Sequence, residues 1–598
     1  MTVETNNQPL VPKYTDYNSF LELFETCVDR HHQQDNIFIR YKVPNTNTFE
    51  FKTLTYSQVD TIATYLANQW EPMLLRSNST KQSCIAVLND SPIQAILSFF
   101  ATLKLGLIYF PLSMFDSEAA ILHLLKKSKT SILIASKTNR EKAFHCIEML
   151  RNDGDERIGI QVYDHEFDID QMLSEAKAMD SMRSPNSQDD GDYPSSHKKR
   201  RTLIDKKTDP SDPIIYMHTS GSTALPKLIS WTTQSSLYGS LGGIVDCIQH
   251  STNGTELMIK STDVLLYPVL TISGPETEFL IPTMLAGGSI LLFDHKPPTP
   301  SEQLAAMEKF GVTLMISAPV GLEIFAEYLK ELDKEKDDTR DKHHTNLLEG
   351  IKFCITYGVQ LQIPIGDYLR SKGLNIQSLY GSTETSCISL SNLSKHNNKW
   401  YDITPTPRLM QHIMLEPYNE DSSLYHLVIR NSFPSLAKGV GNRPNGDYAT
   451  KDLLTITKKS DNDSLGIWTL VGRMDDAINT KFGDKVIPGP MEKEIRNEEI
   501  IQHCTIIGDN RECTAVLVEL NFDKAIKYSP VEMTSKVYDA VNRANKYALS
   551  EAMISVPSMV YILPLNKQLP KTKKGAVIRK ESIVTFYQEI EQMYKNVL

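Results

Sequence analysis

Short apolar runs alternate with longer helical patterns through the first half of the chain. Residues 83–88 and 106–112 are apolar and suited to strands, and residues 93–105 between them have the spacing of a buried helix. Further strand-like runs begin near residues 130, 263, 288 and 311. Strands that alternate with helices are typical of parallel sheets covered by helices. The pattern therefore predicts an α/β fold with mostly parallel sheets.

One polar segment interrupts this pattern. Residues 181–207 are rich in proline, serine and charged side chains and nearly free of apolar ones, which predicts a disordered surface loop. The loop contains a basic run at 198–201 that could act in nuclear import or bind an anionic partner. A charge run inside a solvated loop usually has no further role, and we favour that interpretation.

The segment 214–227, IIYMHTSGSTALPK, is the most informative stretch of the sequence. An apolar strand runs into hydroxyls and a glycine whose backbone N–H groups can point at an anion, and a lysine follows as a point charge. This chemistry suits a triphosphate, although a Ser/Thr-rich turn without a ligand is the alternative. The spacing fits neither a P-loop nor a GxGxxG turn. The candidate nucleotide-binding residues here are Thr219, Ser220, Gly221, Ser222, Thr223 and Lys227.

This segment resembles the signature loop of the AMP-forming adenylate superfamily, which includes acyl-CoA synthetases, luciferases and adenylation domains of peptide synthetases. Ala224 stands where the second glycine of that loop is usual. Further family motifs follow in the expected order: YGSTE at 380–384, YATKD at 448–452, GRMDD at 472–476 and LPKTKKGAVIR at 569–579. Each motif alone is weak, but their shared order favours the resemblance.

The resemblance implies roles for individual residues. Thr383 is expected to contact the α-phosphate, and Glu384 to hold Mg2+ together with Thr223, because hard oxygen ligands suit this ion. Tyr380 is expected near the adenine, with Gly381 and Ser382 beside the nucleotide. Asp452 is expected to accept hydrogen bonds from the ribose hydroxyls. Two further roles are implied: Arg473 reaches the ribose or phosphates, and Asp475 is the hinge. Lys451 replaces a family glycine.

The last motif departs from the family pattern. Ala576 stands where the catalytic lysine is usual, while Lys573 and Lys574 precede Gly575. The combination of GDKVIPGPME and KTKKGAVIR resembles adenylation domains of fungal reductase-type proteins that are similar to non-ribosomal peptide synthetases. That resemblance implies Lys574 as the catalytic cation and Lys485 as a second one.

The family architecture implies two domains. We expect a large N-terminal body of several subdomains over residues 1–471 and a smaller, mobile α+β C-terminal lid over 472–598. The acid pocket is expected to include Thr271, Tyr357, Gly358 and Gln360.

The sequence gives a partial indication of which class of carboxylic acid is the substrate. The segment 272–279 lacks the aspartate of amino-acid pockets, which disfavours an amino acid. Glu276 and Glu278 could replace this aspartate, but we favour exposed carboxylates at a helix start. An aryl or medium aliphatic acid is the expected substrate.

We therefore predict an enzyme that uses ATP and Mg2+ to convert a carboxylic acid into an acyl-adenylate with release of pyrophosphate. Only 18 residues follow Lys580, so we expect a free-standing unit that passes the acyl group in trans to CoA, a phosphopantetheinyl carrier protein or another acceptor. Two alternatives stay open. One is an acyl-CoA ligase; the other is a degenerate ATP- or AMP-binding protein, suggested by Ala224, Lys451 and Ala576.

Composition limits partners and location. The 63 basic and 73 acidic side chains give a net charge of −10, which argues against nucleic acid as the main partner. The sequence has no signal peptide and no apolar run long enough to span a membrane. Its eight cysteines contain no CxxC pair and fit reduced thiols. We therefore expect a cytoplasmic protein.

Overall fold

The computed structural model of the chain describes residues 14–32, 35–43, 49–76, 83–152, 161–164, 168–182, 209–219, 225–252, 259–267, 274–293, 297–335, 338–391, 399–418, 423–457, 466–481, 485–548, 553–572 and 575–595. The loop predicted at 181–207 lies outside these residues from position 183 onward, as does its basic run at 198–201.

The largest sheet of the described part has eight strands, in the order β14-β13-β12-β11-β9-β10-β1-β2. The pairs β13–β14 and β1–β2 at its two edges are antiparallel, and the inner pairs are parallel. The inner strands β9, β10 and β11 are buried along their whole length, which explains their uninterrupted apolar runs. The strands are β1 Ile37–Lys42, β2 Phe51–Thr55, β9 Val264–Tyr267, β10 Ser289–Leu292, β11 Leu314–Ser317, β12 Phe353–Tyr357, β13 Ile376–Ser382 and β14 Ser386–Leu390.

A second sheet has the order β6-β5-β3-β4-β7-β8 among the residues that are described. Its strands are parallel except for the β7–β8 hairpin, which brackets the predicted phosphate loop. The strands are β3 Cys84–Leu88, β4 Ile108–Pro111, β5 Thr130–Ala135, β6 Gln161–Asp164, β7 Pro213–Thr219 and β8 Lys227–Thr232.

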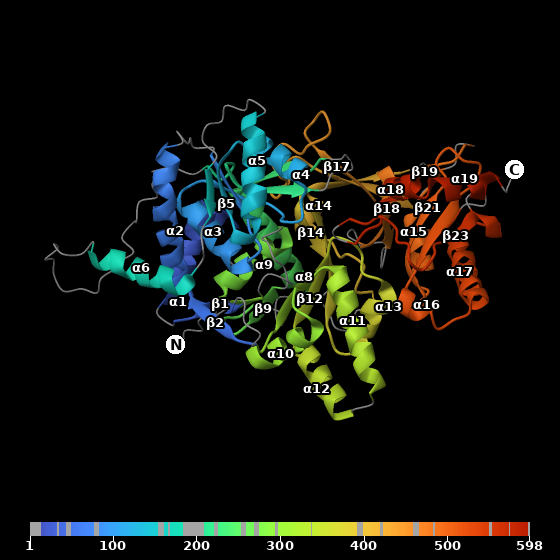
Figure 1. Cartoon of the computed structure of the whole chain (residues 1–598), viewed down its shortest axis with the longest axis horizontal. Helices are drawn as coiled ribbons and strands as arrows, with labels where there is room; N and C mark the ends of the chain where they lie inside the picture. The colour runs from blue at the N-terminus through green and yellow to red at the C-terminus, as the bar shows by residue number, and fades with distance from the viewer. Residues whose placement is uncertain are drawn as a thin grey trace, which may run out of the picture.

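Helices cover both sheets (Figure 1). The predicted buried helix is α3, and its Phe99 and Phe100 belong to one hydrophobic core with Tyr109 of the second sheet and Leu265 of the first. This shared core joins the two sheets into one body. The helical segments of the body are η1 Tyr14–Asp16, α1 Phe20–His32, α2 Tyr56–Arg76, α3 Pro92–Lys104, α4 Glu118–Ser128, η2 Lys137–Asn139, α5 Arg140–Asn152, α6 Ile169–Met182, α7 Thr233–Leu237, the π-helix η3 Tyr238–Val245, α8 Asp246–Thr252, α9 Gly274–Leu285, α10 Pro300–Phe310, α11 Pro319–Lys334, α12 Asp338–Glu349, α13 Ile363–Ser371 and α14 Pro407–Met410.

A four-stranded antiparallel sheet links the body to the C-terminal part of the chain. Its order is β15-β16-β17-β18, counted over the described residues, and it packs around the fully buried Trp468. The strands are β15 Ile413–Pro417, β16 Leu424–Ile429, β17 Tyr448–Thr457 and β18 Ile467–Arg473.

The C-terminal part forms a smaller α+β domain with its own core, which extends from Ile478 to Tyr594 (right side of Figure 1). This arrangement confirms the predicted fold class, a parallel-rich α/β body followed by a smaller domain. Its segments are η4 Met474–Asp476, β19 Ile478–Asn479, β20 Lys485–Val486, α15 Gly489–Ile495, β21 Ile501–Ile507, β22 Ala515–Leu520, α16 Phe522–Ala525, α17 Pro530–Ala544, η5 Asn545–Tyr547, η7 Pro557–Met559, β23 Val560–Ile562, α18 Arg579–Thr585 and α19 Tyr587–Lys595.

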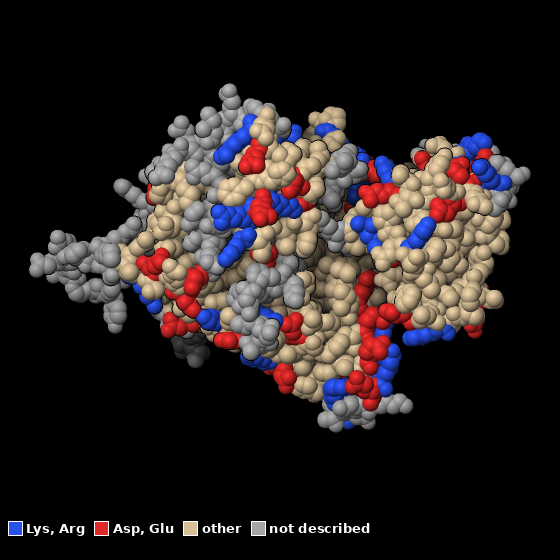
Figure 2. All heavy atoms as spheres, viewed as in Figure 1, with Lys and Arg blue, Asp and Glu red and all other residues tan. Residues whose placement is uncertain are grey.

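Figure 2 shows a groove between the body and the C-terminal domain, with acidic side chains along part of its wall. Across this boundary, the Lys524 ammonium of α16 lies 3.0 Å from a carboxylate oxygen of Glu327 on α11. In the ranges that the structure describes, no helix has both the length and the apolar character needed to cross a membrane.

Candidate active site

A cavity of about 1490 Å³ lies between the body and the C-terminal domain. It collects most of the described residues that the sequence motifs single out, although these are far apart along the chain. From the body and the end of β18 come Thr219, Lys227, Gly358, Gln360, Tyr380, Gly381, Ser382, Thr383, Glu384, Asp452 and Arg473. From the C-terminal side come Asp475, Asp476, Thr572 and Ala576. The cavity lies where β12 and β13 end, and the carboxyl ends of parallel strands are where open α/β sheets commonly bind ligands.

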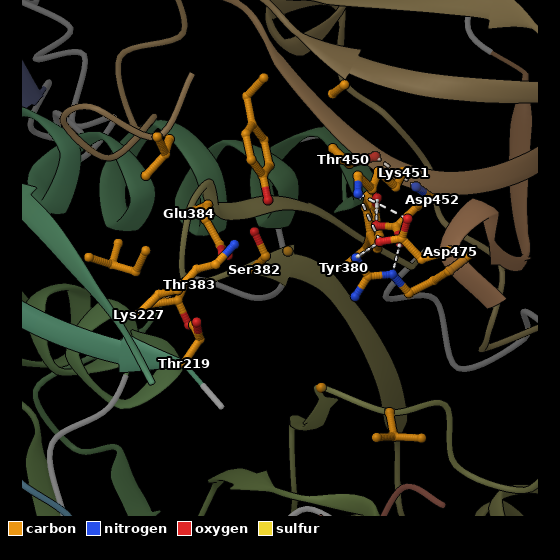
Figure 3. A pocket seen from close by; sticks show the side chains of 18 of the residues that line it. Thr219, Lys227, Tyr380, Ser382, Thr383, Glu384, Thr450, Lys451, Asp452 and Asp475 are labelled. Atoms are coloured by element: carbon orange, nitrogen blue, oxygen red, sulfur yellow. Dashed lines mark hydrogen bonds and ion pairs between the residues drawn. The ribbon is translucent and has the colours of Figure 1, made fainter. Parts of the chain in front are cut away.

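One side of the cavity carries the predicted phosphate-binding groups (Figure 3). Thr219 and Lys227 are partners in register at the loop end of the β7–β8 hairpin, so the loop between them starts and ends at the cavity. Residues 220–224, which include four predicted ligands, lie outside the described residues.

The turn between β13 and β14 holds Thr383 and Glu384 at the same side. The Trp231 indole N–H donates a hydrogen bond to the Thr383 carbonyl at 2.7 Å, and the Ala437 N–H donates to the Glu384 carbonyl at 2.8 Å. These bonds fix the backbone of the turn, so the side chains of both residues can face the cavity. Gly381 permits the close approach of β14, because a Cβ there would lie 2.2 Å from the Ser386 carbonyl oxygen.

The opposite side of the cavity carries a partly buried carboxylate, that of Asp452. The Tyr380 hydroxyl donates to Asp452 Oδ2 at 2.7 Å, and Arg473 Nε lies 3.5 Å from Asp452 Oδ1. Burial raises the pKa of Asp452 above its ordinary value, although the Tyr380 hydrogen bond and Arg473 act against this shift. Burial and the nearby Asp452 also raise the pKa of Tyr380, which keeps its hydroxyl protonated as a donor. The carboxylate is thus held in a fixed orientation by Tyr380 and Arg473.

Lys451, the residue that replaces a family glycine, has a left-handed backbone with φ +67°. Glycine adopts this conformation freely, whereas another residue incurs a cost of about 1 kcal/mol or more. The Lys451 ammonium lies 2.9 Å and 3.0 Å from the two carboxylate oxygens of Asp475, the predicted hinge residue. The carboxylate of this predicted hinge residue is therefore paired with a lysine of strand β17 (Figure 3).

The final motif forms a tight hairpin in the C-terminal domain. Lys571 and Val577 form an antiparallel bridge, the Thr572 N–H donates to the Ala576 carbonyl at 2.7 Å, and Gly575 has φ +84°. This hairpin brings Thr572 and Ala576 to the cavity.

The two predicted catalytic lysines cannot be placed at the cavity. Lys574 lies outside the described residues, and only the backbone of Lys485 is described, in β20. Their positions relative to the nucleotide stay predictions.

The predicted acid pocket is brought together in part. Gly358 and Gln360 line the cavity, whereas Tyr357 packs against the hydrophobic core of the body. Thr271 lies outside the described residues, as does the side chain of Glu276.

The exposed position expected for Glu278 is wrong. This side chain is only 2% exposed and accepts a hydrogen bond from the Cys387 N–H at 2.8 Å and another from the Ser386 hydroxyl. Helix α9 packs on β14, and this long-range contact removes Glu278 from water.

Some residues of the cavity wall were not predicted. His123 and Lys127 line it from α4, and Lys438 and Arg443 line it from the segment between β16 and β17. The spacing of four places His123 and Lys127 on one helix face. No motif in the sequence indicates that this face meets the cavity.

Comparisons with known proteins agree with this geometry. The sequence pattern of the AMP-binding enzyme family matches residues 24–412, and that of the AMP-binding enzyme C-terminal domain matches residues 475–598. The adenylate-forming reductase Nps11 of Serpula lacrymans is 26% identical over 408 residues, which cover 65% of this chain and 34% of that protein. The adenylate-forming reductase stbB of Stachybotrys bisbyi is 21% identical over 608 residues, covering 100% of this chain and 50% of that protein.

The chain therefore spans between about a third and a half of the length of these relatives. Among solved structures, ATP-bound MatB from Rhodopseudomonas palustris has a TM-score of 0.68 at 16% identity and covers 95% of this chain and 99% of that one. The predicted resemblance to fungal adenylate-forming reductases is confirmed by the sequence relatives. Because one family pattern matches well over half of its length, this chain belongs to the family of AMP-binding enzymes.

Proposed function

We propose that this chain condenses a carboxylic acid with ATP to an acyl-adenylate, releases pyrophosphate, and then transfers the acyl group to a nucleophilic acceptor. One observation carries the proposal. One cavity is lined by three groups: the candidate phosphate-binding residues Thr219, Lys227 and Thr383, the fixed carboxylate of Asp452, and the final hairpin of the C-terminal domain.

The two walls suit the two halves of a nucleotide. Asp452, held by the Tyr380 hydroxyl, accepts hydrogen bonds from the ribose hydroxyls in this proposal. Thr219, Lys227 and Thr383 bind the phosphates from the opposite wall. Glu384 holds Mg2+ together with Thr223, because magnesium is commonly bound by one or two protein oxygen ligands plus substrate phosphates. When bound, the ion neutralises charge on the phosphates.

The chemistry is an in-line displacement at phosphorus. A carboxylate oxygen of the acid attacks the α-phosphorus, the bond from that phosphorus to the bridging oxygen breaks, and pyrophosphate leaves with the bonding electrons. The acid needs no general base, because a carboxylate is already ionised at neutral pH. Catalysis then consists of positioning and charge stabilisation. Lys574, with Lys485 as a second cation, supplies part of that stabilisation.

For the substrate, we propose an aryl or medium aliphatic acid bound near Thr271, Tyr357, Gly358 and Gln360. The position of Glu278 supports an acid without an ammonium group, because its carboxylate is directed at the backbone of β14. An ammonium ion in this region would need a carboxylate partner.

The acceptor is proposed to be the thiol of CoA or of a phosphopantetheinyl carrier protein. Its sulfur attacks the acyl carbon, AMP leaves, and a thioester results. We propose that the lid reorients about Asp475 between the two half-reactions. The change from the core around Trp468 to the core that begins at Ile478 supports the proposed boundary between residues 471 and 472. The cytoplasmic location and the transfer in trans stay predictions.

An acyl-CoA ligase would use the same chemistry with CoA as the acceptor. Formation of an acyl-CoA thioester when CoA is added after adenylation would distinguish it from an enzyme that uses a carrier protein. A degenerate nucleotide-binding protein would bind ATP without turnover. The strained backbone at Lys451 is the described feature that favours this second candidate.

The test is acid-dependent exchange of radioactive pyrophosphate into ATP, with Mg2+ and a panel of aryl, fatty and amino acids. Asp452→Asn and Lys574→Ala are the matched variants. We expect exchange with at least one acid, weaker ATP binding in Asp452→Asn, and a lower kcat in Lys574→Ala. Intact ATP binding without exchange for any acid would overturn the adenylation proposal and favour the degenerate alternative.

A further inference from the structure

The hairpin at 571–577 is small, yet two of its residues reach the cavity. Its internal hydrogen bonds close the turn, but they do not attach it to the rest of the C-terminal domain. The segment that leaves the hairpin is attached through Arg579, whose guanidinium donates to the Ile506 carbonyl at 2.9 Å and to Glu492 Oε1 at 2.8 Å. The segment that enters the hairpin, residues 569–572, needs a separate attachment to the C-terminal domain.

That attachment is Glu519, on strand β22 of the C-terminal sheet (β21 and β23 are labelled in Figure 1). Glu519 is only 4% exposed. Its Oε2 accepts a hydrogen bond from the Leu569 N–H at 2.7 Å, and its Oε1 accepts one from the Lys571 ammonium at 2.9 Å. One buried carboxylate thus bonds both to the backbone that leads into the hairpin and to the first residue of the hairpin.

The charge pattern around Glu519 favours Lys571 as its counter-ion. His503 is the register partner of Glu519 on β21. Burial, followed by the charges of Lys571 and Arg496, lowers the pKa of His503 to about 4, so this ring is neutral at physiological pH. A buried carboxylate requires both a counter-charge and hydrogen bonds, and Lys571 and the Leu569 N–H supply them.

We propose that Glu519 is a positioning residue for adenylation, because it holds the hairpin of the final motif against the cavity. The proposal rests on the proposed function, in which Lys574, located between Thr572 and Gly575 in the sequence, acts on the reacting phosphate. Glu519 does not line the cavity; Thr572 and Ala576 of the hairpin do. Small displacements of a catalytic group are enough to lower a rate strongly.

The test compares Glu519→Gln with a matched control, Glu498→Gln. Glu498 is also a largely buried glutamate of the C-terminal domain and pairs with Lys536 at 3.3 Å and Arg543 at 3.2 Å, but it has no bond to the described residues of the hairpin. We expect Glu519→Gln to lower the kcat of ATP–pyrophosphate exchange about tenfold or more while the KM for ATP changes less than about twofold. Glu498→Gln should change neither by more than about twofold.

Hydrogen–deuterium exchange of the full-length protein gives a second readout that does not depend on the acid or on activity. The peptide spanning residues 569–577 should exchange faster in Glu519→Gln than in the wild type and in Glu498→Gln. If Glu519→Gln does not fold, Lys571→Met removes the other side of the same pair. The double variant Glu519→Gln/Lys571→Met should be no worse than the more damaged single variant, since both changes remove one attachment.

Three results would each overturn the inference. They are equal losses of kcat in Glu519→Gln and Glu498→Gln, an effect of Glu519→Gln on KM alone, and an unchanged rate of deuterium exchange in the 569–577 peptide. Failure of the proposed function is distinguishable. In that case the wild type shows no acid-dependent exchange, while the deuterium experiment still decides whether Glu519 fixes the hairpin.

Discussion

Removing the Tyr380 hydroxyl should weaken ATP binding and change its pH dependence. The variant is Tyr380→Phe, which deletes the donor at 2.7 Å from Asp452 Oδ2 and leaves the ring in place. Arg473 Nε, at 3.5 Å from the other carboxylate oxygen, is a weaker neighbour. Asp452 therefore loses its shortest side-chain hydrogen bond in a partly buried position.

The magnitude follows from the charge of the acceptor. A hydrogen bond to an ionised group contributes about 1.5–3 kcal/mol, so loss of this bond should weaken ATP binding about tenfold to about a hundredfold. The loss has two sources. The carboxylate is less well oriented toward the ribose, and its ionised form is less stable than in the wild type.

The direction of the pH effect follows from the pKa of Asp452. Burial already raises this pKa, and the Tyr380 hydrogen bond lowers it in part. As pH falls, Asp452 becomes protonated and loses its ability to accept two hydrogen bonds from a diol. Removing the Tyr380 donor raises the pKa further, so the loss of ATP affinity on acidification should begin at a higher pH in the variant.

The assay is calorimetric titration of ATP across the acidic to neutral range, which requires no knowledge of the acid. Tyr109→Phe is the matched control, because Tyr109 is also buried and its hydroxyl donates to the Ala95 carbonyl at 3.2 Å, away from the cavity. If the ATP affinity of Tyr380→Phe falls on acidification at the same pH as that of the wild type and of Tyr109→Phe, the reasoning is refuted.

Three further predictions concern the cavity wall. Gly381→Ala should abolish measurable ATP binding, because the new Cβ would meet the Ser386 carbonyl oxygen at 2.2 Å; retained affinity in a titration would contradict the close approach. Lys451→Gly and Lys451→Ala both lose the Asp475 ion pair, but the glycine variant should be more stable by about 1 kcal/mol because of the left-handed backbone, as thermal unfolding would show. Glu384→Gln should raise the Mg2+ concentration needed for half-maximal pyrophosphate exchange, and an unchanged requirement would exclude this carboxylate as a ligand.

The fold and most of the cavity wall follow from short-range features of the sequence. Apolar runs such as 83–88 and 93–105 became β3 and α3, because an element buried on all sides needs apolar residues throughout. The motifs at 380–384 and 448–452 marked cavity residues in advance, because nucleotide binding depends on particular side chains in short, contiguous turns and strands.

The sequence left open whatever depends on contacts between distant segments. Glu278 has the sequence context of an exposed helix start, but its burial is decided by β14, more than 100 residues later. His123 and Lys127 share a helix face, and only the packing of the body turns that face to the cavity.

The partners of isolated charged residues were decided in the same way. Lys451 appeared only as a departure from a glycine, and the structure pairs it with the carboxylate of Asp475, the predicted hinge residue. Glu519 belongs to no motif, yet it bonds to the chain 50 residues further on. The spacing of apolar positions predicts which apolar segments are buried, and short motifs mark residues of the cavity. The counter-ion of a buried charge is instead selected by whichever segment the tertiary fold places beside it.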